Sequence, residues 1–295
     1  MTESSSRSPS RATLRALHAD LVYLIDQLPH RVVAIRNIGR MAAEDRGCHL
    51  LTLENGDLIK ARLNVSEVFQ ARATDILDSL TALGFSRVLA RRGKATLEEW
   101  IPGEILSTLA PVAKHAALGG ELLGQVHARS VGTHTTDGIE RDLSWHLGQL
   151  QDSLDELHDR GHLSAEVAAK LKADTQSSVP ATSEMGIVHL DFCADNMVWT
   201  DDEELVVFDN ERFRDGELDF DLARCFMRWP MTASQLAAFR AAYQEHRSLD
   251  AFDAHRGFWM VCALAHSASY ALHAGARNDQ ALDSLARWAE GGATA

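Results

Sequence analysis

The strongest constraint on the fold is a β-rich stretch, residues 186–211, within a second half whose other segments show helical periodicity. Two short apolar runs of β type, residues 197–200 and 205–208, are separated by four consecutive acidic residues, 201–204. Such a pattern predicts an antiparallel hairpin. Its residues are apolar on both faces, so we expect the hairpin to be buried against helices.

The hairpin should end in two polar side chains. A four-residue turn would place residue 200 opposite residue 205, and counting back puts Asn196 opposite Asp209. Side chains so paired share one face, with Cβ atoms roughly 4.5–5.5 Å apart, which suits two oxygen ligands of one metal ion. Magnesium prefers one or two carboxylates together with phosphate oxygens. The alternative is an Asn–Asp hydrogen bond at the end of a strand.

The first hundred residues predict a small antiparallel sheet. Short β-type runs occupy residues 32–35, 49–53, 58–63, 87–90 and 95–100. An Asn55-Gly56 turn joins the second and third runs. One helix, residues 12–28, should precede the sheet, and another, residues 66–83, should end at Gly84.

Beyond Pro102-Gly103 the chain is predicted to be mainly helical. The apolar periodicity indicates helices over residues 107–130, 138–173, 216–227 and 233–290, the last in several pieces. A loop near residues 174–185 should lead into the β-rich stretch.

Composition excludes several classes of protein. The formal net charge of −13 disfavours a nucleic-acid partner, because phosphates require clustered lysine and arginine. Four scattered cysteines favour reduced thiols over a disulfide framework or a zinc site. No apolar run approaches about 18 residues, so no membrane span is expected. The polar, serine-rich first ten residues indicate a disordered tail and not a secretory signal, which predicts a cytoplasmic protein.

An ordered set of motifs surrounds the hairpin. His189, Asp191 and Asn196 form the pattern His-x-Asp-x-x-x-x-Asn, which resembles the catalytic loop of aminoglycoside phosphotransferases, choline kinases and their protein-kinase relatives. Further segments similar to that family follow the family's order, at residues 97–103 (hinge), 118–127 (similar to the family's helix ending in Leu-x-His, with Gln-Val-His here), 209–211 (Asp-x-Glu) and 216–223 (Gly-(x)4-Asp-Leu-Ala). The resemblance spans roughly residues 31–228.

The resemblance implies an α+β, two-lobed, protein-kinase-like fold. Residues 11–101 would form a helix and a nucleotide-binding lobe with a small antiparallel sheet. Residues 102–295 would form a mainly helical lobe with the catalytic loop and substrate pocket, and residues 1–10 a disordered tail.

The resemblance also implies an enzyme that uses ATP and magnesium to phosphorylate a hydroxyl of a small molecule. Asp191 would be the catalytic base, and Asn196 and Asp209 the magnesium ligands, assisted by Glu211. His189 would be architectural and Asp221 would brace the loop, whereas Asp195 receives no role.

On the nucleotide side, the hinge should hold adenine through backbone groups of Glu98, Glu99, Trp100 and Ile101. Trp100 could equally belong to the core. The family's Gly-rich loop is absent, since only Asn-Ile-Gly-Arg-Met stands at residues 37–41. The acidic partner of the strand lysine is left open among Glu67, Asp75 and Asp78 in the predicted helix.

Two cations are candidates for the ATP phosphates. Lys60 and Arg62 alternate with apolar residues on one strand, so both should lie on the face opposite the one that packs on a helix. Lysine is the residue that kinase-like folds use here and is favoured. The spacing of six residues after Gly56, common in the family, points instead to Arg62.

The acceptor stays open. An aminoglycoside-like antibiotic, choline, a sugar or an amino alcohol fits equally, and ATP is not distinguished from GTP. One alternative is a non-catalytic nucleotide-binding module, suggested by the missing Gly-rich loop. Another is a zinc hydrolase using His189, Asp191 and Asp209, which lacks a further histidine at ligand spacing. The sequence does not indicate the oligomeric state.

Overall fold

The chain divides into two compact units, each described here by itself. The computed structural model describes residues 17–38, 47–64, 66–80, 82–129 and 143–291. The first unit comprises Met1–Glu104 and Met197–Phe213, and the second Ile105–Asn196 and Arg214–Ala295. Residues 197–213 thus group with the first unit, whereas the sequence-based division placed them in the helical lobe.

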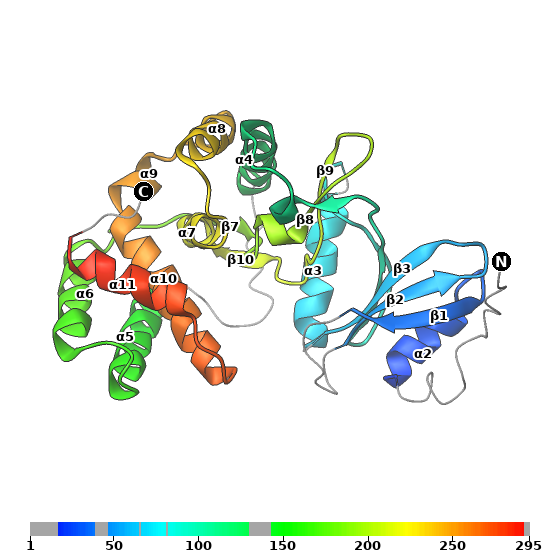
Figure 1. Ribbon diagram of the computed structural model, residues 1–295, viewed down its shortest axis with the longest axis horizontal. Coiled ribbons are helices and arrows are strands. Elements are labelled where there is room, and N and C mark those ends of the chain that lie inside the picture. Colours follow the sequence, from blue (N-terminus) through cyan, green and yellow to red (C-terminus); the bar gives the residue numbers. More distant parts are fainter. Residues whose placement is uncertain (1–16, 39–46, 65, 81, 130–142, 292–295) are drawn as a thin grey trace. The chain divides into compact units, whose positions relative to one another are not determined.

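A five-stranded antiparallel sheet with strand order β1-β2-β3-β5-β4 dominates the first unit (Figure 1). Its strands are β1 (Val32–Asn37), β2 (Cys48–Leu53), β3 (Leu58–Leu63), β4 (Val88–Arg92) and β5 (Ala95–Glu99). The predicted small antiparallel sheet is therefore confirmed. Gly56 has a φ of 92° in the turn between β2 and β3, a conformation that explains glycine at this position.

Helix α2 (Ala19–Asp26) covers the apolar face of this sheet. Its buried residues Leu21, Leu24 and Ile25 form one cluster with Ile59, Ala61, Leu63 and other apolar residues of the strands. The alternation in β3 therefore directs its apolar side chains to a helix, as predicted. The predicted start of this helix, residues 12–16, lies outside the described residues.

Helix α3 (Glu67–Ser79) follows β3. The Ser66 hydroxyl accepts a hydrogen bond from the Phe69 N–H at 3.4 Å and so caps its first turn. The helix ends four residues before the predicted end at residue 83.

Strands β8 (Met197–Trp199) and β9 (Leu205–Val207) form the predicted hairpin, but its register differs by one residue. Met197 pairs with Val207, and the Thr200 N–H donates to the Glu204 carbonyl at 3.0 Å. The chain reverses in three residues because Glu203 adopts a φ of 60°. The prediction that Asp209 is the strand partner of Asn196 is wrong.

Helices make up most of the second unit (Figure 1). They are α4 (Ala113–His127), α5 (Leu143–Asp159), α6 (Ala165–Ser177), α7 (Leu218–Arg228), α8 (Ala233–Gln244), α9 (Asp250–Ala254), α10 (Arg256–His273) and α11 (Asp279–Ala289). Short strands β7 (Met185–Val188) and β10 (Arg214–Glu217) pair antiparallel. The remaining elements are β6 (Glu104–Ile105) and the 3-10 turns η1 (Leu106–Thr108) and η2 (Ala194–Asn196).

The predicted helix 138–173 is two helices, α5 and α6. Gly161, with a φ of 74°, ends the first, and the Ser164 hydroxyl caps the second by accepting from the Val167 N–H at 3.2 Å. Helix α6 runs to Ser177, into the region predicted as a loop. Residues 138–142 lie outside the described part of the chain.

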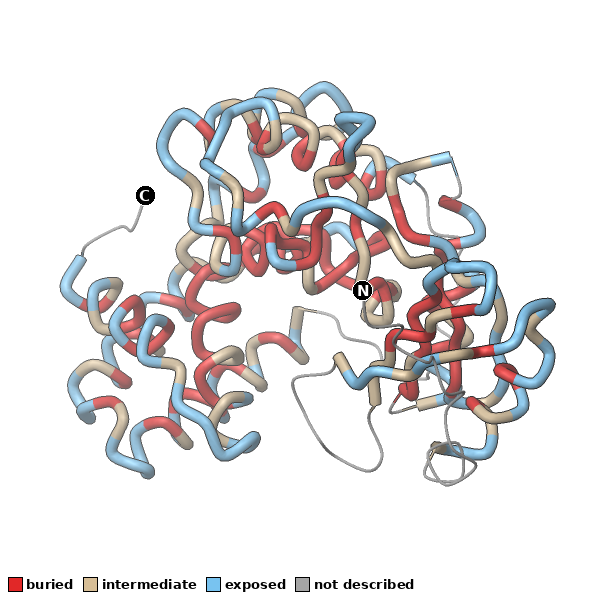
Figure 2. The backbone as a smooth tube through the Cα atoms, turned by 45° about the vertical axis from the view of Figure 1, so that its right-hand side comes forward, coloured by how far each residue is buried: buried red, intermediate tan, exposed pale blue. Residues whose placement is uncertain are grey.

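The core of the second unit is continuous around α7 and α10. Residues 216–225 and 258–265 are unbroken buried runs, and buried stretches of the chain are red in Figure 2. In the part of the chain that the structure describes, no helix is long and apolar enough to span a membrane.

Helices α4 and α8 approach each other closely at a glycine, which generates a prediction. A Cβ at Gly120 would collide with the main-chain carbonyl of Phe239, whose carbon would lie 2.8 Å away. Gly120→Ala should lower the free energy of unfolding by about 1–3 kcal/mol, measured by urea denaturation. Gly148→Ala is the control, because a Cβ there meets nothing within 4 Å and alanine favours the helix. Equal effects of the two variants would contradict the packing described.

Candidate active site

The loop after strand β7 is fixed by a buried carboxylate on helix α7. Asp221 accepts hydrogen bonds from the main-chain N–H groups of His189 and Leu190, each at 2.7 Å. Leu190 has a φ of 61°, a left-handed conformation that a leucine rarely adopts. The predicted bracing of this loop by Asp221 is confirmed.

Asp221 also lies 3.1 Å from Nε2 of His127, at the end of α4. Burial by itself raises the pKa of Asp221, but the hydrogen bond and charge of His127, with those of His189, lower it overall. The other ring nitrogen of His127 lies 2.8 Å from the Tyr243 hydroxyl. The Asp221 carboxylate of α7 therefore joins the loop after β7 to α4, and His127 links it to α8.

Asp191 and Asn196 lie together in the second unit. The Asn196 amide nitrogen donates to the main-chain carbonyl of Asp191 at 2.8 Å and to its Oδ2 at 3.0 Å. His189 is architectural, since its ring accepts from the Asp191 N–H at 3.2 Å and is fully buried. The Asp191 side chain is 13% exposed.

Two arginines that the sequence analysis did not single out contact the same loop. The Arg228 guanidinium donates to Asp191 Oδ1, and Arg224 Nη2 lies 3.9 Å from the same oxygen. A sequence signal existed: Asp221, Arg224 and Arg228 are spaced three and four residues apart, which places them on one face of a helix.

In the first unit, the predicted phosphate-binding cations lie against the predicted metal ligands. Lys60 and Arg62 both donate to Asp209 Oδ1, and Arg62 Nη1 lies 2.6 Å from Glu211 Oε2. Burial by itself raises the pKa of Asp209, yet Arg62 and Lys60 outweigh it and lower this pKa to about 2. Asp209 therefore stays ionised at neutral pH, as a metal ligand must.

The acidic partner of Lys60 comes from strand β5. Glu98 stands directly opposite Lys60 in the sheet, with Oε2 3.2 Å from Lys60 Nζ and Oε1 3.4 Å from Arg62 Nε. The expectation that this partner lies in the helix after β3 is wrong. The physical reason is the pleat: opposed residues on β3 and β5 share a face, so Glu98 needs no helix to reach Lys60.

The other three residues predicted to contact adenine, Glu99, Trp100 and Ile101, are less buried than Glu98. Glu99 is partly exposed, its carboxylate pairs with Arg87 at 3.0 and 3.1 Å, and its N–H donates to the Arg87 carbonyl at 2.9 Å. Trp100 and Ile101 are half-buried. The Glu99 N–H is therefore already used within the sheet, and the side chain of Glu98 has an electrostatic role that was not foreseen.

The donors of the first unit suit a magnesium ion. Asp209 and Glu211 are carboxylates with side chains about one third exposed, at 32% and 30%. With Glu98 they place three carboxylates around two cations, which leaves negative charge in excess. Among the described residues, no group of three or more His, Cys, Asp and Glu side chains could hold a metal ion. Magnesium needs only one or two carboxylates.

The chain matches the model of the phosphotransferase enzyme family over residues 58–258. The match covers most of the chain and includes all the candidate residues from Lys60 to Glu211. The protein therefore belongs to this family of small-molecule phosphotransferases. No curated protein matches the chain.

Solved structures share the fold at low identity. The macrolide 2'-phosphotransferase MphH from Brachybacterium faecium is 16% identical with a TM-score of 0.63, over 90% of this chain and 96% of the other. An ADP-bound aminoglycoside phosphotransferase, APH(2'')-Ib, is 16% identical with a TM-score of 0.64, over 94% and 100%. The Plasmodium vivax ethanolamine kinase is 13% identical with a TM-score of 0.62, over 88% and 83%. The predicted two-lobed, protein-kinase-like fold is confirmed.

The buried position of Glu98 generates a prediction. Glu98→Gln removes a charge that contacts both Lys60 and Arg62, whereas Asp209 and Glu211 still compensate them in part. The free energy of unfolding should fall by about 1.5–3 kcal/mol, the range for hydrogen bonds to charged groups, measured by urea denaturation at neutral pH.

The adjacent Glu99→Gln is its matched control. Glu99 pairs with Arg87 on the surface, where water and salt weaken the ion pair, so its replacement should change stability little. A loss as large as that of Glu98→Gln would show that burial of Glu98 is not what matters.

Proposed function

We propose that the protein transfers the γ-phosphate of ATP to a hydroxyl of a small molecule, with Asp191 as catalytic base. The observation that supports this most is that one family match includes the loop of Asp191 and the charged cluster of Lys60, Arg62 and Asp209. The ADP in one structural neighbour supports a nucleotide co-substrate.

In this proposal, Asp191 orients the acceptor hydroxyl and takes its proton while the hydroxyl oxygen forms a bond to the γ-phosphorus. The bond between that phosphorus and its bridging oxygen breaks, and ADP leaves. Asn196 holds Asp191 through two hydrogen bonds, and the brace at Asp221 fixes the main chain beside it. These contacts restrict the orientation of the base before the acceptor binds.

The charged residues of the first unit serve the nucleotide. We assign Asp209 and Glu211 as carboxylate ligands of magnesium, with Asn196 as a further oxygen ligand, and Lys60 and Arg62 as contacts for phosphate oxygens. Magnesium, when bound, neutralises charge on the phosphates. The backbone near Trp100 and Ile101 is proposed to hold the adenine.

Replacement of the base tests the chemistry. Asp191→Asn keeps the shape but removes the proton acceptor, so turnover with ATP, magnesium and an acceptor should fall by about 10²- to 10⁴-fold. ADP formation by coupled assay measures it, and nucleotide affinity should change little. Asp201→Asn, in an exposed turn, is the control and should retain full turnover. Turnover of Asp191→Asn within threefold of wild type would exclude this base, and a wild type that binds ATP but transfers nothing would favour the non-catalytic module.

Replacement of the cations tests the phosphate contacts. Lys60→Met and Arg62→Met each remove a donor for phosphate, and each leaves Asp209 and Glu98 with one cation in place of two. At least one variant should raise the Michaelis constant for ATP about tenfold or more, as expected when a charge-assisted contact is lost. Lys94→Met, an exposed lysine of the same unit, is the control. Unchanged constants in both variants would show that neither cation contacts the phosphates.

A further inference from the structure

Helix α7 brings two arginines to the carboxylate proposed as catalytic base. Arg228 donates to Asp191 Oδ1, and Arg224, one turn earlier, places Nη2 3.9 Å from the same oxygen. Arg224 Nε also donates to the Leu190 carbonyl at 2.7 Å, and its Nη1 lies 3.5 Å from Nδ1 of His266. The side of Asp191 that faces α7 is therefore cationic.

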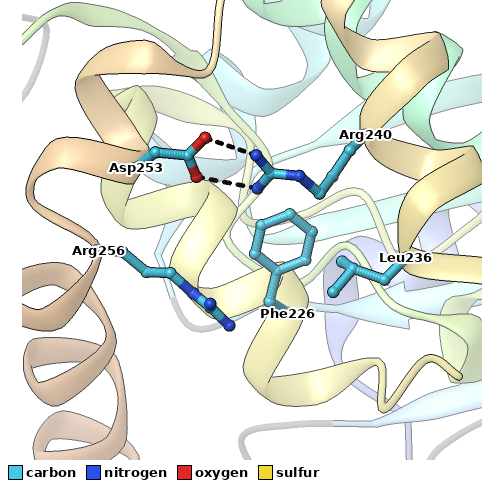
Figure 3. A pocket seen from close by; sticks show the side chains of 5 residues that line it. All are labelled: Phe226, Leu236, Arg240, Asp253 and Arg256. Atoms are coloured by element: carbon cyan, nitrogen blue, oxygen red, sulfur yellow. Dashed lines mark hydrogen bonds and ion pairs between the residues drawn. The ribbon is translucent and has the colours of Figure 1, made fainter. Parts of the chain in front are cut away.

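Neither arginine forms a bidentate ion pair with Asp191, in which two nitrogens would contact two oxygens. Both approach one oxygen, and the other, Oδ2, accepts from Asn196. Figure 3 shows the contrasting case in this unit: Arg240 and Asp253 join two nitrogens to two oxygens, at 3.0 and 2.5 Å. A guanidinium has five N–H donors in a fork that matches a carboxylate or phosphate. Arg228 contacts Asp191 through one nitrogen only, and its side chain is 34% exposed, so it can reach a second anion.

The cavity in Figure 3 is separate from the site around Asp191. Its volume is about 320 Å³, and its lining consists of Phe226, Leu236, Arg240, Asp253 and Arg256. Phe226 is two residues from both Arg224 and Arg228, which puts it on the opposite side of α7. The cationic side of Asp191 is therefore not part of this cavity.

Two arginines stand beside Asp191, although the chain carries a formal net charge of −13. Asp191 and Asp195 balance their charge, so the site is distinguished by its guanidinium donors and not by an excess of positive charge. The other nearby acid is Asp195, whose charge acts on Arg228 and whose residue is exposed. An acceptor amino group would find no hydrogen-bond acceptor on the Arg228 guanidinium, which has only donors, and this disfavours its binding there. An anionic group of the acceptor would meet the complementary cationic guanidinium of Arg228.

We propose that Arg228, supported by Arg224, binds an anionic group of the acceptor, so that the substrate is a hydroxylated carboxylate or phosphate ester and not an amine. The proposal rests on the function proposed above. When the acceptor's anion takes the Arg228 guanidinium, Asp191 Oδ1 is released to accept the hydroxyl proton. Arg228 is thus a specificity-determining residue that links recognition of the acceptor to exposure of the base.

Four alcohols with the same three-carbon skeleton provide the test: glycerol, aminopropanediol, glycerate and glycerol phosphate. Binding to the full-length protein is followed by the thermal unfolding midpoint and by calorimetric titration, and ADP formation is measured in parallel with ATP and magnesium. Glycerate, glycerol phosphate or both should bind the wild type more tightly than the neutral and amino compounds. Comparing the two anions separates a carboxylate from a phosphate ligand.

Arg228→Gln should weaken binding of the preferred anion about tenfold or more and weaken binding of glycerol much less. A purely structural role of Arg228 would reduce both. Arg228→Lys keeps the charge but loses the forked guanidinium, so its affinity for the preferred anion should lie between those of the wild type and Arg228→Gln. It replaces the glutamine variant if that variant does not fold. Arg287→Gln, an equal charge change on α11, should match the wild type.

The outcomes separate this inference from the proposed function. Anion binding that depends on Arg228, without ADP formation from any compound, would support the inference and contradict the function. Preferred phosphorylation of aminopropanediol or glycerol would support the function and overturn the inference. Failure of both anions to bind, or equal binding to wild type and Arg228→Gln, would also overturn it.

Discussion

The second unit depends on how one buried charge, the carboxylate of Asp221, is compensated. An uncompensated carboxylate would be costly inside the fold. Asp221 is compensated by the N–H groups of His189 and Leu190 and by the ring of His127. A left-handed leucine costs roughly 1–2 kcal/mol, which the hydrogen bond from the Leu190 N–H offsets. Arg224 on the same helix holds the Leu190 carbonyl, so α7 fixes both main-chain polar groups of the residue preceding Asp191.

The first unit shows the same combination of an unusual backbone and a compensated carboxylate. Asp209 has a φ of 61°, close to that of Leu190. Its side chain accepts from Lys60 and Arg62, whose own burial is supported by Glu98 on the neighbouring strand. Non-glycine residues in this conformation persist only where surrounding contacts determine them, and they cluster at functional sites. Of the three such residues in the described part of the chain, one is a proposed metal ligand and one immediately precedes the proposed base, whereas Glu203 lies in the hairpin turn.

Local patterns predicted the elements well and the contacts between them less well. Alternation in residues 58–63 predicted both the strand and its cationic face, because pleating fixes the direction of each side chain. The predicted hairpin register was wrong because one residue, Glu203, adopts a left-handed conformation that its residue type does not predict. The role of Glu98 was missed because pairing between β3 and β5 is not local in sequence. Arg228 was missed because the family motif ends at residue 223, five residues earlier.

The candidate carboxylates of both units are already paired with cations of the protein. Asp209 and Glu211 contact Arg62, and Asp191 contacts Arg228. A divalent cation bound to Asp209 alone would displace Lys60 and Arg62 from it. These buried cations would then keep only Glu98 and, for Arg62, Glu211, and the loss of one carboxylate partner is costly. A phosphate bound to Lys60 and Arg62 alone would leave the carboxylates uncompensated. If, as proposed, metal and phosphate bound together, each new charge would take the partner that the other releases, and the ion pairs would exchange with little net loss. On the proposed function, the charges within the first unit would therefore favour joint binding of metal and nucleotide over binding of either one.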